Sequence, residues 1–120
     1  MSTPKEIKLR KTSRLLELTF DDDRRFELSF ECLRVYSPSA EVKGHGPGQE
    51  RLQVGKENVG IEDIEPIGHY AVRLVFDDGH NTGLYSWKYL RELGEKREQN
   101  WRDYLDRLEA AGYARENPES

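Results

Sequence analysis

The chain has 120 residues and a formal net charge of −4, and its hydrophobic and charged fractions are each 35%. This length suits one small domain, and the negative charge argues against general nucleic-acid binding, which needs a basic surface. No apolar run approaches the roughly 20 residues of a membrane-spanning helix, and a lone cysteine excludes an internal disulfide and favours a reducing compartment. We therefore expect a cytoplasmic globular domain that binds neither nucleic acid nor membrane.

The first half of the chain alternates apolar and polar residues, which is typical of half-buried strands. This alternation predicts strands at residues 7–9, 16–20 and 26–30. The last two form a hairpin with the acidic tip Asp21–Asp23. Residues 32–36 then predict a short helix or an irregular turn, which Pro38 ends because proline disfavours helix in the residue before it. The glycine-rich segment Lys43–Gly48 predicts a loop.

The second half of the chain moves from strands to helices. Strand signals are weak at residues 52–54 and 59–64 and strong at residues 70–76. Ser86 is a suitable helix N-cap, and the spacing of Trp87, Leu90 and Leu93 predicts a helix that Gly94 closes. A second helix begins near residue 95, and Gly112 ends it.

Strands that precede helices predict an α+β fold, in which a small antiparallel β-sheet built from hairpins is packed by C-terminal helices. We expect one domain over residues 6–112, with residues 95–112 as a C-terminal helical extension. Residues 1–5 and 113–120 are expected to be flexible ends.

The most distinctive segment is the acidic turn Asp77–Trp87, which places His80 and two glycines between a predicted strand and a predicted helix. A turn on a rigid scaffold is a common place for binding chemistry. The sequence leaves two roles open for His80: it binds a metal or a partner's anionic group, or its ring holds the turn by bonding a neighbouring loop near Ser37.

Two segments resemble the gamma-butyrobetaine hydroxylase-like N-terminal domain family. They are Leu33–Glu41, followed by Gly44 and His45, and Asp78–Leu90. The resemblance implies a small stand-alone bacterial member of this family. Related domains form the N-terminal part of 2-oxoglutarate-dependent hydroxylases, and others are fused to P-loop ATPases that carry iron–sulphur clusters.

The resemblance also implies that a zinc site found in related hydroxylases is absent from this chain. In the hydroxylases, three cysteines and a later histidine bind zinc, and the corresponding positions here are Ser37, Ser39, Val42 and His80. Serine and valine cannot replace zinc-binding thiolates. We therefore expect that the zinc site is lost and that His80 survives from it.

The remaining candidates concern iron, ion pairing and nucleophiles. His80, His45 and Glu41 form a set of imidazole and carboxylate groups that suits iron, or zinc held weakly. Arg34 is expected to pair with Glu41 or Asp78 and so to join the two loops. Cys32 lies in an apolar context that is typical of a small buried side chain, and the serines lack the glycine context of a hydrolase nucleophile.

These observations predict a non-enzymatic binding or adaptor module. We expect it to need no cofactor. Its protein partner would be a P-loop iron–sulphur carrier ATPase, as the family resemblance implies. The alternatives are a protein that binds iron or zinc and a regulatory subunit of a 2-oxoglutarate-dependent hydroxylase. The expected partner surface comprises Arg34, Ser37, Ser39, Asp78, His80 and Tyr85.

Overall fold

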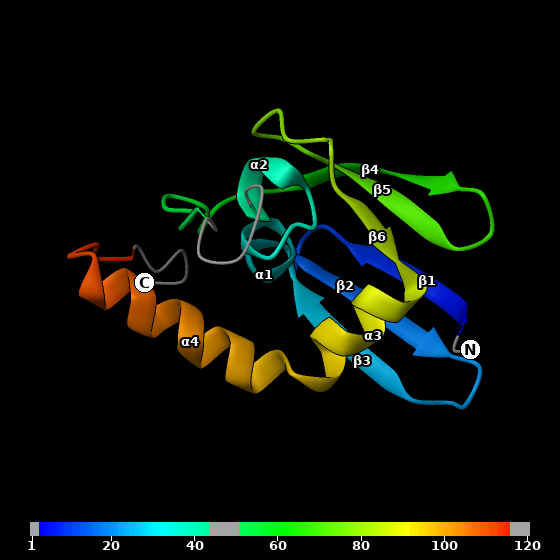
Figure 1. Ribbon diagram of the computed structural model, residues 1–120. Helices are drawn as coiled ribbons and strands as arrows, with labels where there is room; N and C mark the ends of the chain where they lie inside the picture. The colour runs from blue at the N-terminus through cyan, green and yellow to red at the C-terminus, as the bar shows by residue number, and fades with distance from the viewer. Residues whose placement is uncertain (1–2, 44–50, 116–120) are drawn as a thin grey trace.

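The computed structural model describes residues 3–43 and 51–115. Its strands form two antiparallel sheets, which have the orders β1–β2–β3 and β4–β5–β6 (Figure 1). The strands are β1 (Pro4–Arg10), β2 (Leu15–Phe20), β3 (Arg25–Ser29), β4 (Ile61–Ile67), β5 (Ala71–Phe76) and β6 (Leu84–Ser86). The helices are α1 (Phe30–Val35), α2 (Ala40–Lys43), α3 (Trp87–Glu95) and α4 (Arg97–Ala110). The α+β prediction is confirmed, with the strands divided between two sheets.

The hairpin of β2 and β3 follows directly from the alternating sequence. Leu16 pairs with Leu28, and Leu18 pairs with Phe26, so the large apolar side chains of both strands share one buried face. At the tip, Asp23 adopts a φ of 67°, a left-handed conformation that aspartate tolerates better than most residues. The predicted acidic tip therefore forms the turn.

α1 begins where the sequence predicted the end of a strand. The hydroxyl of Ser29 accepts a hydrogen bond from the backbone amide of Cys32 at 3.0 Å, which is an N-cap. Phe30, which fits the strand alternation, is instead the first helical residue. The cap ends β3 one residue early and directs the chain into α1, which lies at the centre of the molecule (Figure 1).

α3 begins at its predicted cap but does not end as predicted. The Ser86 hydroxyl accepts from the Tyr89 amide at 3.0 Å. Gly94 does not close the helix, because α3 continues to Glu95. A Cβ at Gly94 would lie 2.5 Å from the Phe26 ring, so glycine is needed here for close packing of α3 on β3. By contrast, Gly112 has a φ of 76° just beyond α4, as expected of a helix stop.

Residues 51–60 contain no strand, although the sequence gives a weak strand signal there. Their backbone is held by side chains instead of by a β-ladder. The Tyr104 hydroxyl of α4 donates to the Gln53 carbonyl at 2.7 Å, and Arg14 donates to the Glu57 carbonyl at 3.5 Å. Tertiary contacts therefore override the weak local preference in this segment.

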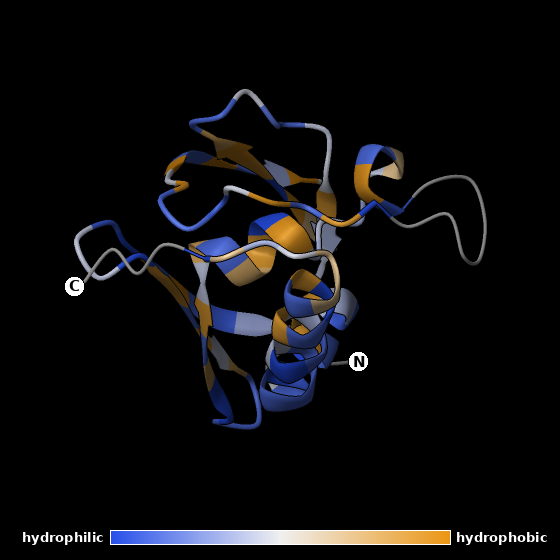
Figure 2. Ribbon diagram, turned by 90° about the vertical axis from the view of Figure 1, so that its left-hand side faces the viewer, coloured by the Kyte–Doolittle hydropathy of each residue, from blue (hydrophilic) through white to orange (hydrophobic). Residues whose placement is uncertain are grey.

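The core consists of a main cluster and a smaller one. The main cluster combines both sheets with α1 and α3, and includes Leu18, Phe20, Leu28, Leu33, Leu74, Phe76, Tyr85 and Leu90. The smaller cluster fixes α4 to α1 through Val35, Tyr104 and Leu108. Figure 2 shows the apolar segments turned inward, with hydrophilic residues on the turns and over much of α4.

Both described chain ends make specific contacts with the rest of the fold. β1 begins at Pro4, inside the expected flexible end. Tyr113 bonds Glu57, and Arg115 bonds Glu31. Within residues 3–43 and 51–115, none of the helices has the length and apolar character needed to cross a bilayer.

Candidate functional site

His80 lies in the tight turn that connects β5 to the short strand β6. The turn is closed by a hydrogen bond from the Phe76 amide to the His80 carbonyl at 3.0 Å. The Asp78 carboxylate accepts from the His80 amide at 3.1 Å. Gly79 takes a φ of +89°, a conformation that side-chain-bearing residues rarely adopt. The acidic and glycine residues of the motif thus shape the turn that directs the His80 ring inward.

The His80 ring is buried between two residues of the segment 36–43. Its Nε2 lies 2.8 Å from the Ser37 Oγ, and its Nδ1 lies 3.0 Å from the Glu41 Oε2. The side chain of His80 is 2% exposed, whereas that of Glu41 is 63% exposed. A histidine far along the chain therefore joins two loops, which we call the loop pair (residues 36–43 and 77–84).

Burial determines the charge and the tautomer of His80. Desolvation, together with the positive charge of Arg34, lowers the pKa of His80, and these effects outweigh the opposing influence of Glu41. The ring is therefore neutral at pH 7. An ionised carboxylate can only accept, so Nδ1 carries the proton that is donated to Glu41. Nε2 then accepts from the Ser37 hydroxyl.

The chain Ser37–His80–Glu41 has the order of a nucleophile, a base and an acid in a hydrolase triad. Its surroundings differ from those of an active nucleophile, because Ser37 is 0% exposed. Gly83 lies against the hydroxyl so closely that a Cβ there would be 2.5 Å from the Ser37 Oγ. No substrate carbonyl can reach that oxygen in this conformation, and the hydrogen bonds hold the two loops together.

A second set of ion pairs flanks the histidine. Arg34 of α1 donates from Nε to Asp78 at 2.9 Å, and Lys56 donates from Nζ to the same oxygen at 2.7 Å. Burial acts to raise the pKa of Asp78, but these hydrogen bonds and the one from the His80 amide lower it to about 2. Asp78 is therefore anionic at neutral pH, and the pairing of Arg34 with Asp78, one of the two that the sequence allowed, is formed.

Two further bonds complete the junction. The Ser39 and Thr82 hydroxyls lie 2.7 Å apart. The Tyr85 hydroxyl, on β6, donates to the Leu33 carbonyl of α1 at 2.5 Å. Together with the His80 bonds, they connect α1 and its following loop to the second sheet at several points.

The zinc site implied by the family resemblance does not fit these residues. Ser37 and His80 do lie side by side, as two positions of one former site would. However, Ser37 and Ser39 supply hydroxyl groups and Val42 an apolar side chain, and zinc requires thiolate, imidazole or carboxylate donors. Hydrogen bonds among Ser37, His80 and Glu41 connect the segments that zinc would otherwise join.

For iron, the structure brings together two of the three suggested ligands. His80 and Glu41 are in contact, while His45 lies outside the described residues. Among the described residues, no group of three histidine, cysteine, aspartate or glutamate side chains could hold a metal ion. Both His80 ring nitrogens already have hydrogen-bond partners within the loop pair.

The structure places most residues of the predicted partner surface inside the molecule. Arg34, Ser37, Ser39, His80 and Tyr85 are all buried, so in this conformation they cannot touch a partner directly. They are internal because they bond each other across the loop pair, and they position the exposed residues around them. Of the six predicted positions, only Asp78 is exposed.

Three residues that the sequence did not point to complete this network. They are Lys56, which bonds Asp78; Gln53, which accepts from Arg34 at 3.1 Å; and Thr82. Lys56 and Gln53 lie in the segment with no regular structure, where no periodicity marks their position. Thr82 lies within the distinctive turn, and its position next to Gly83 is the only local feature that could have marked it.

Comparisons with known proteins bear on the whole domain. The profile of the family described as "Gamma-butyrobetaine hydroxylase-like, N-terminal" matches residues 7–91. No match was found among the curated proteins. Two NMR solution structures superpose with TM-scores of 0.83 each. One is 49% identical and covers 100% of this chain and 94% of its own. The other is 52% identical and covers 98% and 87%.

A crystal structure from Acidithiobacillus ferrooxidans, of a protein with unknown function in the DUF971 family, is 41% identical with a TM-score of 0.66. It covers 77% of this chain and 92% of its own. The matched profile extends from β1 into α3 and includes both segments of the loop pair. The chain therefore belongs to the gamma-butyrobetaine hydroxylase-like N-terminal domain family.

Proposed function

We propose that the protein is a non-enzymatic adaptor whose partner binds the outer face of the loop pair. The observation that carries this proposal is the burial of Ser37, whose hydroxyl is fully covered and lies against Gly83. A hydroxyl that no substrate can reach supports a structural role for its hydrogen bond to His80. A rigid pair of loops reduces the entropy lost when a partner binds.

The exposed residues of the loop pair indicate the chemistry of the partner. The Glu41 side chain is 63% exposed, and Leu84 is 47% exposed. Acidic and apolar groups on the exposed part of the loop pair suit a partner that offers basic and apolar side chains. Asn81 and Thr82 are also exposed and add polar groups to the loop pair.

The first partner to test is a P-loop ATPase that carries iron–sulphur clusters, because such domains occur fused to carriers in this family. This assignment, and the cytoplasmic location that it implies, rest on the family resemblance. A 2-oxoglutarate-dependent hydroxylase is the second partner to test. In both cases the chain contributes the binding surface and the partner contributes the chemistry.

The experiment is a titration of the ¹⁵N-labelled chain with the purified carrier from the same organism, followed by amide chemical shifts. We expect the shifts to centre on the loop pair and Leu84→Ser to weaken binding about tenfold or more, since it removes an apolar contact. Glu109→Ser, on the exposed face of α4, is the control and should leave binding unchanged. Absence of binding to both partners, or shifts confined to α4, would contradict the proposal.

Two side measurements separate the alternatives. Hydrolysis of p-nitrophenyl acetate that is lost in Ser37→Ala would show an active serine and contradict the non-enzymatic assignment. Stoichiometric iron or zinc in untagged protein, lost in His80→Ala, would favour the metal-binding alternative, which the contact between His80 and Glu41 supports.

A further inference from the structure

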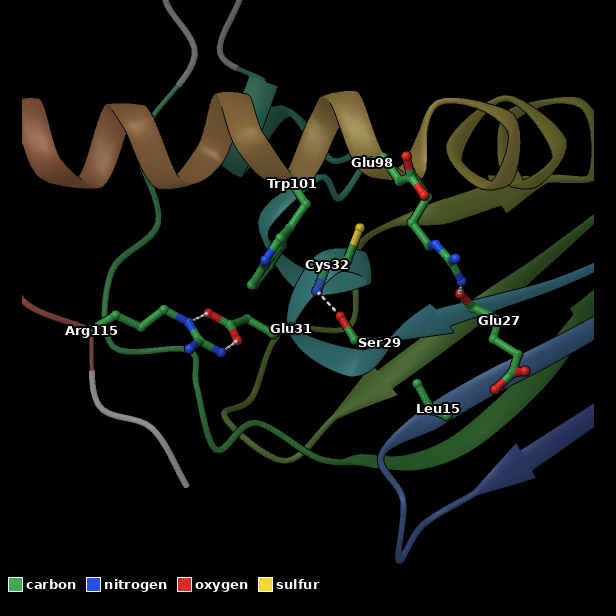
Figure 3. A pocket seen from close by; sticks show the side chains of 9 residues that line it. Leu15, Glu27, Ser29, Glu31, Cys32, Glu98, Trp101 and Arg115 are labelled. Atoms are coloured by element: carbon green, nitrogen blue, oxygen red, sulfur yellow. Dashed lines mark hydrogen bonds and ion pairs between the residues drawn. The ribbon is translucent and has the colours of Figure 1, made fainter. Parts of the chain in front are cut away.

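A second candidate site lies on another face of the molecule. A cavity of about 340 Å³ opens between the first sheet, the start of α1 and α4 (Figure 3). Its volume falls in the range of about 300–1,000 Å³ that is typical of ligand sites. Leu15, Cys32 and Trp101 provide its apolar wall, and Trp101 points from α4 toward α1.

One end of this cavity is built to bind a guanidinium group. Arg115 donates from Nε to Glu31 at 2.9 Å and from its terminal amine to the other carboxylate oxygen, which makes a two-point contact. Its guanidinium carbon also lies 5.2 Å from the centre of the Trp101 ring. A carboxylate fork beside an aromatic face is the arrangement that selects arginine over lysine. We call Glu31 and Trp101 the guanidinium slot.

The slot and its occupant come from parts of the chain with different anchoring. Glu31 is 6% exposed and belongs to α1 at the centre of the fold. Arg115 follows α4 in a segment without helix or strand and has a side chain that is 27% exposed. Tyr113, two residues before Arg115, bonds Glu57, so the chain is anchored there independently of the slot.

The charges around the cavity favour a cationic occupant. Three carboxylates line it, from Glu27, Glu31 and Glu98, against the two arginines Arg97 and Arg115. When Arg115 leaves, the balance is three anions to one cation, and Glu31 becomes a buried carboxylate that needs another positive partner. An anionic ligand would be repelled.

The apolar wall indicates what accompanies the cation. Arg115 fills only the slot, and the volume beside Leu15 and Cys32 stays open. Burial, assisted by the charge of Glu31, raises the pKa of the Cys32 thiol to about 11, so this wall is uncharged. An arginine next to an apolar side chain would satisfy the slot and the open volume together.

We propose that the guanidinium slot and its cavity bind a protein segment that presents an arginine followed by an apolar residue, and that Arg115 is a competing occupant from the chain itself. This site is separate from the loop pair, so its test is independent of the adaptor proposal. Occupancy of the cavity would then be coupled to the position of the Arg115 side chain.

The test titrates the ¹⁵N-labelled full chain with a capped Gly-Arg-Leu-Gly peptide and with the same peptide carrying citrulline in place of arginine. The Trp101 indole resonance reports on the slot. We expect Arg115→Ala to bind the arginine peptide about tenfold tighter than the wild type, because it removes an intramolecular competitor. Arg102→Ala, which removes an exposed arginine of α4, is the control and should bind as the wild type does.

Glu31→Gln should abolish binding of the arginine peptide, and a thermal melt checks that this variant is folded. If it is unfolded, the comparison of arginine and citrulline peptides on Arg115→Ala decides the question. Equal binding of the two peptides, or no gain in Arg115→Ala, would overturn the proposal. Light scattering that shows a dimer lost in Arg115→Ala would also overturn it, since the occupant would then be a second copy of the chain.

Discussion

Tyr85→Phe tests whether the junction between α1 and the second sheet stabilises the fold. Tyr85 is 0% exposed, and its hydroxyl donates to the Leu33 carbonyl at 2.5 Å. Phenylalanine keeps the ring and its packing and removes the hydroxyl. The variant therefore removes the hydrogen bond to Leu33, 52 residues away, together with the interaction of the hydroxyl with the Ser37 side chain.

The expected loss follows from what remains buried. The Leu33 carbonyl stays in the core without this donor, and such a group costs about 1–3 kcal/mol. A domain of this size is typically stable by about 5–15 kcal/mol, so a substantial share is at stake. The melting temperature should fall by roughly 4 °C or more for each kcal/mol lost.

Urea denaturation of wild type and variant, followed by tryptophan fluorescence, measures this loss. Tyr70→Phe is the matched control, since Tyr70 is 60% exposed and its change should stay within about 0.5 kcal/mol. If Tyr85→Phe and Tyr70→Phe proved equally harmless, the assigned role of the Tyr85 hydroxyl would be refuted. A change in the slope with urea would instead indicate an altered unfolded state.

Three further predictions concern the same core. Gly83→Ala should destabilise the protein by about 1–3 kcal/mol in urea unfolding, because the new methyl group would lie 2.5 Å from the Ser37 hydroxyl. Unchanged stability would mean that the two loops are not closely packed. Gly94→Ala should also destabilise the protein, because the new Cβ would lie 2.5 Å from the Phe26 ring. This is expected although alanine favours helix over glycine by about 1 kcal/mol. A raised melting temperature would contradict the packing of α3 on β3. His80 has a lowered pKa in the fold, so the folded state binds fewer protons than the unfolded state just below pH 6.5. Stability should therefore fall as the pH drops below about 6.5, and His80→Gln should flatten that dependence in urea unfolding measured from pH 7 to pH 5.

The elements that the sequence predicted well are those encoded over a few neighbouring residues. The alternation in β2 and β3 decides which side chains face inward, whatever lies against them. Ser86 caps α3 by bonding an amide only three residues away. The same locality explains the turn around His80, where Asp78 and Gly79 shape the backbone within two residues of the ring.

The tertiary structure alone decided how distant segments meet. His80 joins Glu41 across 39 positions, and Glu31 joins Arg115 across 84. Such pairs leave no periodic trace, because they depend on how whole elements dock. Gly94 is another case in which a distant contact matters. A glycine near the end of a helical pattern predicts the end of the helix, but here a glycine is needed because the Phe26 ring of β3 packs against it. The order of strands and helices in the sequence was enough to predict an α+β architecture and to single out the histidine turn. That the His80 ring is buried and joins the two loops depends on their docking, because its partners Ser37 and Glu41 belong to a distant segment.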